Sequence, residues 1–295
     1  MSSSMSLGAV EVAPLPPIAA PLRRVLEVFG FWAVWVGLGF ALHLGPEAYL
    51  LTGVPITVAF QVLVRRRPLT ELWVRGGPLN VDRWSLAIGV ALAVMPVIAI
   101  VKAAREHAWL GVAWSGCALI GAFAGGASLR RLGAWGWKQL ALCLVVAGGI
   151  GSASMLLSAV VRHFMLHTAI GFSFRTFGTS LLLYFAVCFV LEEVSFRGAV
   201  DAHLNPAGRW NIGFAIMSSV LWGLWHLPIV LAMPLPTPMP MAARILGSCI
   251  SLALIHGLIG VPLSYYFGRS GNLAVTSSAH AFADAIRNAL GMMPT

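Results

Sequence analysis

Three short polar motifs interrupt the apolar runs in the second half of the chain. Glu192 and Glu193 lie in CFVLEEVSFRG, His226 lies in VLWGLWHLPIV, and His280 and Asp284 lie in SSAHAFADAIRN. A carboxylate beside imidazoles and a second carboxyl can activate water by general-base catalysis and stabilise an oxyanion, which is what peptide-bond hydrolysis requires. An ionisable group inside an apolar segment costs roughly 2.5 kcal/mol or more at the centre of a bilayer. These residues are therefore the candidates for function.

Spacing within two of the motifs predicts which side chains share a helix face. Arg197 follows Glu193 by one helical turn, so the two side chains can pair. Neighbouring residues on a helix point about 100° apart, so we expect Glu193 to be the structural partner of Arg197 and Glu192 to face a cavity. His280 and Asp284 share a face in the same way. The spacing leaves open whether the three motifs meet in space.

The composition indicates that these motifs lie in a membrane protein. Hydrophobic residues make up 59% of the 295 residues, charged residues 10%, and the mean hydropathy is +0.86. A soluble domain carries about 25% charged residues. Segments of about 20 apolar residues can cross a bilayer as helices. Such segments occur at residues 24–44, 47–64, 84–102, 108–127, 139–161, 177–197, 211–232, 242–267 and 272–291.

The sequence therefore predicts an all-α, polytopic integral membrane protein with eight or nine transmembrane helices. Residues 1–22 are rich in proline and are expected to form a mobile tail, while residues 23–295 form a single transmembrane domain. In this assignment Glu192 lies near the end of its helix and His226 lies much deeper. Bent or offset helices are needed to bring the two together.

The net charge of +9 comes from short basic clusters between the apolar segments. No basic domain stands outside the lipid, which excludes a nucleic-acid partner. If the N-terminus is cytoplasmic, about 13 of the 19 Lys and Arg residues lie on the cytoplasmic side, as the positive-inside rule favours. The four cysteines have no paired spacing, which excludes a disulfide framework.

Each polar residue also has a purely structural interpretation. The two glutamates could be a charge cluster at a helix end, and His226 could be a hydrogen-bonded packing residue. His256, in LALIHGLIG, has no polar neighbour in the sequence and is interpreted as structural. His163 and His167 share a helix face and could bind a metal, but the glutamate of an HExxH motif is missing.

Taken together, the three motifs resemble a known family. Residues 192–197 match EExxxR, residues 222–226 resemble FxxxH with Trp222 in place of Phe, and GRSGNLAVTSSAHAFADAI resembles a block that ends in HxxxN or HxxxD. In this order they resemble the CPBP family of CAAX endoproteases and bacteriocin-processing proteins, which are also called Abi proteins. This family includes the Ras-converting endoprotease. The resemblance covers a catalytic core at about residues 177–291.

The resemblance implies a glutamate-dependent intramembrane endopeptidase. Glu192 and His280 would activate water, while His226 and Asp284 would stabilise the oxyanion, without a metal. The main rival is a zinc protease with Glu192, His226 and His280 as ligands. Asp284 stands where some members have Asn, and an ionised Asp cannot donate to an oxyanion. Its carboxyl would then be protonated, or would orient His280. Trp222 in place of Phe is expected to change only packing.

The substrate is expected to be a membrane-delivered peptide or protein, processed at a C-terminal tail, a sorting signal or a leader. Arginine outnumbers lysine and alanine and glycine are abundant, which favours a bacterial inner membrane. Two other functions remain open. The same fold could serve as a non-catalytic scaffold, or the acids and histidines could relay protons or ions in a transporter. No inverted repeat of the kind found in many transporters is visible.

Overall fold

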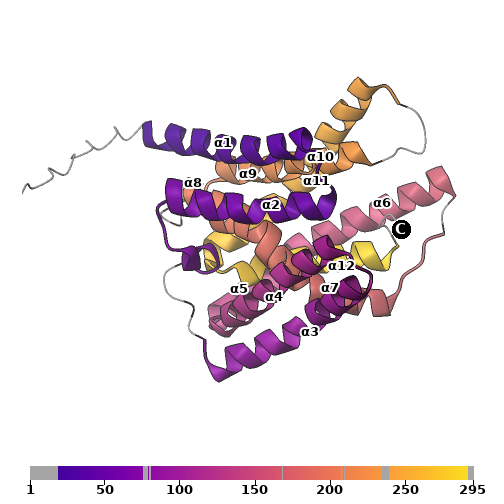
Figure 1. Cartoon of the computed structure of the whole chain (residues 1–295). Coiled ribbons are helices and arrows are strands. Elements are labelled where there is room, and N and C mark those ends of the chain that lie inside the picture. Colours follow the sequence, from indigo (N-terminus) through magenta and orange to yellow (C-terminus); the bar gives the residue numbers. More distant parts are fainter. Residues whose placement is uncertain are drawn as a thin grey trace, which may run out of the picture.

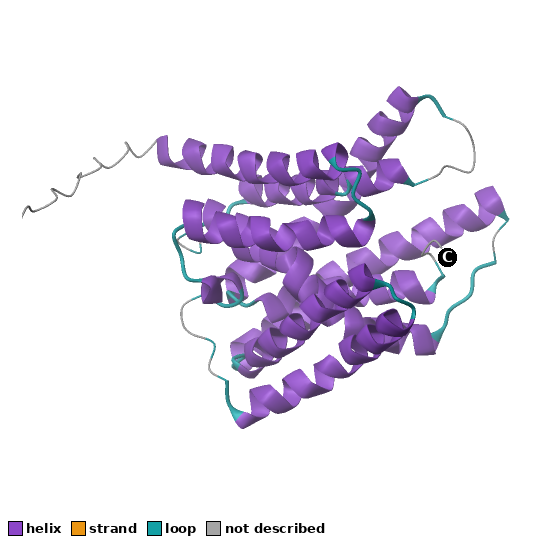
Figure 2. Ribbon diagram, in the orientation of Figure 1, coloured by secondary structure: helices purple, strands orange, loops and turns teal. Residues whose placement is uncertain are grey.

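The computed structural model describes residues 19–75, 79, 81–167, 169–206, 208, 210–233 and 239–291. These residues form helices and loops without a strand (Figure 2), apart from one isolated β-bridge between Val74 and Asn272. The first 18 residues of the predicted N-terminal tail lie outside the described residues, and residues 19–22 belong to the first helix. The protein is thus all-α, as predicted.

The helices follow the predicted apolar segments closely. Eight of them, within the described residues, are long and apolar enough to cross a membrane, which confirms an integral membrane protein. The ninth, α12, has 17 residues and lies inside the bundle. The bounds are α1 (Ala19–Ala41), α2 (Pro46–Ala59) with η1 (Phe60–Val64), η2 (Leu69–Leu72), α3 (Arg83–Arg105), α4 (Trp109–Arg130), α5 (Ala134–Cys143) with η3 (Leu144–Gly148) and α6 (Gly149–Leu166), α7 (Phe174–Cys188) with η4 (Phe189–Asp201) and α8 (Ala202–Leu204), α9 (Ile212–Trp225) with α10 (Leu227–Ala232), α11 (Met241–Ser270) and α12 (Leu273–Ala289).

Helices α7 and α12 form the centre of the bundle. In Figure 1, α1, α9, α10 and α11 lie above them and α3 lies below. The segment η4, which continues α7, contacts α2, α4, α9, α11 and α12. A polar residue on η4 can therefore meet side chains from several helices.

Small residues and caps fix the central helices. Gly121 of α4 packs against α7 so closely that a Cβ at this position would lie 2.0 Å from the carbonyl oxygen of Ala186. Such close approach is typical of helix pairs in membranes. Asn272 caps α12 by accepting from the backbone N–H of Ala274, and its Nδ2 donates to the carbonyl of Ser128 at 2.8 Å. The cap therefore ties the start of α12 to the end of α4.

The helix that carries Glu192 is longer than predicted. It runs without a break from Phe174 to Leu204, whereas the apolar segment in the sequence ends at residue 197. Arg197 is instead fully buried, with Nε 3.7 Å from Glu193 Oε2 and Nη1 3.2 Å from Asp201 Oδ2. Because these acidic side chains compensate its charge, the arginine does not end the helix. Glu192 consequently lies well inside the bundle, which resolves the difference in depth from His226.

Candidate active site

The two glutamates lie on a π-helical segment, η4. In a π-helix each backbone N–H bonds to the carbonyl five residues earlier, and such segments are frequent at functional sites. The side chain of Glu193 is 1% exposed and that of Glu192 is 13% exposed. As predicted, the first glutamate faces a cavity and the second is enclosed by protein. The sequence gave no indication of the π-helix.

Glu192 is the point at which the three motifs meet. Its Oε2 lies 4.0 Å from Nε2 of His226 and 3.9 Å from Nε2 of His280. The same oxygen accepts a hydrogen bond from Nε1 of Trp222 at 3.1 Å. The structure therefore brings together the residues that the sequence predicted, from η4, the α9–α10 junction and α12.

Trp222 contributes more than the packing change that the sequence predicted. A phenylalanine at this position would leave Oε2 of Glu192 without the indole donor. The guanidinium of Arg197 also lies 5.2 Å from the centre of the Trp222 ring. Trp222 thus connects Glu192 to the buried arginine, and the expectation that only packing changes is wrong.

Glu193 has the predicted partner and a second one. One carboxylate oxygen, Oε2, lies 3.7 Å from Nε of Arg197, which confirms the predicted pair. The other, Oε1, lies 3.0 Å from Nδ1 of His280. A carboxylate that faces a guanidinium accepts hydrogen bonds, so Nδ1 of His280 carries the proton. Glu193 therefore directs Nε2 of His280 toward Glu192.

His226 is oriented by the end of α9. Its backbone N–H bonds to the carbonyl of Gly223, which leaves the carbonyl of Trp222 for the imidazole Nδ1 at 3.1 Å. A carbonyl can only accept, so Nδ1 of His226 donates and Nε2 faces Glu192. Pro228 follows in the first turn of α10, where a missing N–H is tolerated. The break between α9 and α10 thus lies at the site.

Asp284 is held by a residue that the sequence interpretation missed. Its Oδ1 lies 3.0 Å from Nη1 of Arg287, and its Oδ2 lies 3.8 Å from Nε2 of His280. The buried Cys188 places Sγ 3.6 Å from the same Oδ2. An aspartate paired with an arginine acts as an acceptor, which favours the orientation of His280 over donation to an oxyanion. The i, i+3 spacing of Asp284 and Arg287 was the available signal.

His256 also belongs to the site, contrary to the sequence interpretation. Its Nδ1 lies 2.9 Å from the carbonyl of Leu252, and its ring centre lies 4.5 Å from that of His226. Its ring also packs against the Trp222 ring in a T-shaped arrangement, with ring centres 4.6 Å apart. The interpretation failed because these neighbours come from α9, which the local sequence around residue 256 does not reveal.

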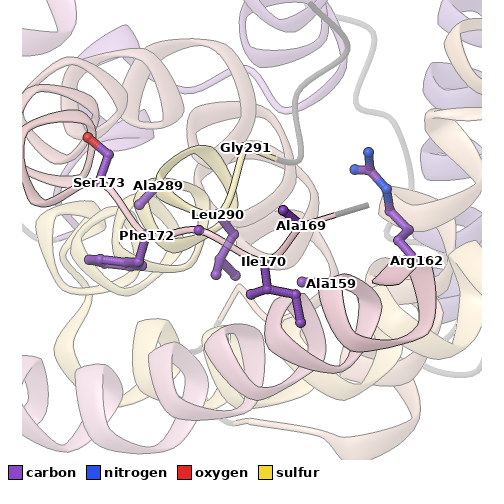
Figure 3. Close-up of a pocket in the computed structure, with 10 residues that line it drawn as sticks. Ala159, Arg162, Ala169, Ile170, Phe172, Ser173, Ala289, Leu290 and Gly291 are labelled. Carbon is purple, nitrogen blue, oxygen red and sulfur yellow. The ribbon is translucent and has the colours of Figure 1, made fainter. Parts of the chain in front are cut away.

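A cavity of about 370 Å³ connects these side chains. Its polar lining comprises Glu192, the three histidines, Asp284 and Arg287, and the rest is mainly apolar. A larger hollow of about 610 Å³ lies beside the ends of α6 and α12 (Figure 3). Among the described residues that line it, Arg162 is the one charged side chain, and none carries a carboxylate or an imidazole. The smaller cavity is therefore the one equipped for acid–base chemistry.

Three buried side chains within the described residues could hold a metal ion. Ligand atoms of Cys188, His280 and Asp284 all lie within 4.8 Å of one another, and all three residue types bind zinc. The predicted pair His163 and His167 does not share a helix face. Helix α6 ends at Leu166, and His167 adopts a left-handed conformation with φ of 53°.

Comparison with known families finds a match over the region that carries the three motifs. Residues 174–286 match the family model described as type II CAAX prenyl endopeptidase Rce1-like. The matched range contains all three motifs and overlaps the predicted catalytic core at residues 177–291. Comparison of the chain with curated proteins and with solved structures finds no match. This region is therefore similar to the Rce1-like family of CAAX-type endopeptidases, in line with the resemblance that the motifs predicted.

Proposed function

We propose that the protein is a glutamate-dependent intramembrane endopeptidase in which Glu192 is the general base. The observation that supports this proposal is the position of one carboxylate oxygen, Oε2, within 4.0 Å of Nε2 of both His226 and His280. The family is one of peptide hydrolases, and the cavity supplies the acid–base groups that such a reaction needs.

The attacking water would lie between Glu192 and His280. The facing atoms are 3.9 Å apart, so an oxygen about 2.8 Å from each can hydrogen-bond to both. Glu192 takes a proton as the water oxygen bonds to the carbonyl carbon and the carbonyl electron pair moves to its oxygen. When the C–N bond breaks, the proton passes from Glu192 to the leaving amine. Glu193 keeps His280 oriented throughout through Nδ1.

His226 would stabilise the tetrahedral oxyanion. Its Nδ1 is occupied by the carbonyl of Trp222, so Nε2 is the atom that reaches the cavity, and it donates when the ring is an imidazolium. Asp284 is assigned a positioning role for His280, because Arg287 occupies its second oxygen. In this mechanism no metal takes part. Zinc held by Cys188, His280 and Asp284 is the alternative to test.

The substrate would be a peptide segment delivered within or along the membrane, such as a C-terminal tail, a sorting signal or a leader. The mainly apolar wall of the cavity, which includes Leu50, Trp114 and Ile229, favours apolar side chains next to the scissile bond. A bacterial inner membrane remains the expected location.

The test is cleavage of a pool of candidate membrane peptides by purified protein. Glu192→Gln and His280→Ala are expected to abolish cleavage, while Glu106→Gln, at an exposed glutamate directly after α3, serves as the matched control. Each is assayed with and without a strong chelator. Loss in both site variants with full activity in chelator would support the proposal. Loss of wild-type activity on chelation would assign the reaction to zinc, and cleavage by Glu192→Gln would exclude this base.

A further inference from the structure

The two ends of the helix bundle differ in charge. Successive long helices alternate in direction, so their ends fall into two groups, with the start of α1 on the left in Figure 1. We call this the basic end, and the other the opposite end. Described residues of the opposite end include Lys102, Arg105, Arg162, Arg175, Arg244 and Arg287. Described residues of the basic end include Arg23, Arg24, Arg65, Arg66, Arg67, Arg75, Arg83, Arg130, Arg131, Lys138 and Arg269.

The cavity reaches the opposite end. Pro46 is the first residue of α2, Met233 follows the last residue of α10, and Arg287 lies in the last turn of α12; all three line the cavity. Pro46 is exposed, and Met233 is 40% exposed. Arg244 of α11 donates to the carbonyls of Val230 and Met233 and fixes this rim. None of the described lining residues comes from the loops of the basic end.

Packed side chains close the cavity toward the basic end. Beyond Glu192 along η4, Phe196 is 2% exposed and Arg197 is fully buried. Trp35 and Trp225, both fully buried, pack on Phe196 with ring centres 6.1 and 5.5 Å away. A buried layer of this kind has few voids larger than a water molecule. A peptide therefore has no route to Glu192 through the basic end.

From this asymmetry we infer that the substrate reaches the site from the non-cytoplasmic side of the membrane. The inference rests on the proposed function and on the positive-inside rule, which places the basic end in the cytoplasm. The class of substrate is then an exported polypeptide, or the non-cytoplasmic part of a membrane protein. Its segment next to the scissile bond is apolar, to match Leu50, Val230 and Met233 on the cavity wall.

Cysteine labelling tests the side on which the cavity opens, without use of the catalytic activity. The two partly exposed native cysteines, Cys117 and Cys249, are first changed to alanine. Met233→Cys then reports the rim. Gly133→Cys, in the segment between Arg131 and Lys138 and with open space around a Cβ, is the matched control at the basic end. Glu47→Cys, exposed beside Pro46, replaces Met233→Cys if that variant does not insert.

A membrane-impermeant maleimide is applied to right-side-out and inverted vesicles from an expression host. The rim cysteine is expected to react fully in right-side-out vesicles and the control cysteine only in inverted ones. Reaction of the rim cysteine only in inverted vesicles, or of both cysteines from the same side, would overturn the inference.

A second measurement connects the rim to catalysis. A bulky label on Met233→Cys is expected to slow cleavage of a peptide added outside at least several-fold, whereas a label on Gly133→Cys leaves the rate unchanged. An unchanged rate with labelled Met233→Cys would exclude this route while Glu192 kept its role. If the rim cysteine is labelled from the expected side but the unlabelled protein does not cleave the peptide, the proposed peptidase function would be refuted instead.

Discussion

Nε1 of Trp222 donates a hydrogen bond to Oε2 of Glu192 at 3.1 Å. The guanidinium of Arg197 lies over the same indole, 5.2 Å from the ring centre. The indole thus holds the proposed base in place from within the buried core. A carboxylate with one fixed donor has fewer orientations, which favours a defined position for the attacking water.

Trp222→Phe removes this donor and keeps a ring of similar shape. Hydrogen bonds to charged groups contribute about 1.5–3 kcal/mol, so we expect kcat to fall by at least about tenfold with little change in KM. Trp225→Phe is the matched control, because Nε1 of Trp225 is buried without a hydrogen-bond partner. Steady-state kinetics of both variants decide the point. Equal losses in the two variants would show that Trp222 acts by packing.

Asp284→Asn tests whether this residue accepts or donates. The change breaks the 3.0 Å ion pair with Arg287 and weakens the orientation of His280. We expect kcat/KM to fall by about tenfold, the equivalent of roughly 1.4 kcal/mol. Activity that is unchanged or higher in Asp284→Asn would show instead that a donor at this position stabilises the oxyanion. Arg287→Gln should reproduce the loss if the pair orients His280.

Arg197→Leu is expected to destabilise the protein severely. The change leaves the buried carboxylates of Glu193 and Asp201 without their shared cation, and breaking a buried ion pair costs about 3–5 kcal/mol. Unfolding in mild detergent, followed by circular dichroism, measures the effect. Arg23→Gln removes an exposed pair with Glu27 and should change stability by less than about 1 kcal/mol. A small effect of Arg197→Leu would contradict a structural role for this buried arginine.

The stability that the start of α3 contributes to the fold should depend on pH through Asp82. The pKa of Asp82 lies below its ordinary value of 3.8, chiefly because its carboxylate accepts from the backbone N–H of Ser85 and also faces Arg130. A lowered folded-state pKa stabilises the protein above the unfolded-state pKa, and the stabilisation is lost as pH falls through the folded-state value.

Asp82→Asn keeps a helix cap but not the charge. The unfolding temperature of the wild type should exceed that of Asp82→Asn at pH 7, and the difference should shrink below about pH 4. Thermal unfolding of both proteins between pH 7 and pH 3 measures this. A difference that stays constant over this range would show that the ionised carboxylate does not stabilise α3.

Much of the fold and part of the site could be predicted from local sequence. Each crossing helix is a run of about 20 apolar residues, and a backbone in lipid satisfies its hydrogen bonds only within a helix or a closed barrel. The pair of Glu193 with Arg197 depends only on spacing along one helix. The family motifs likewise identified Glu192, His226 and His280, because ionisable groups are rare in apolar segments.

Other features depend on contacts between helices and could not be read from one segment. The helix continues through the buried Arg197 to Leu204 because two carboxylates compensate the charge of the arginine. The fold also places the rings of His256 and His226 with their centres 4.5 Å apart. The donor role of Trp222 toward Glu192 likewise arises from the packing of α9 on η4.

The sequence by itself determined which segments are long and apolar enough to cross a membrane and which residues could carry acid–base chemistry, because both follow from residue type and local spacing. Only the tertiary structure decided that the motifs meet at Glu192 and that their cavity opens away from the basic end. These properties depend on how the helices pack side by side, and side-chain contacts between distant segments leave no periodic signal in the chain.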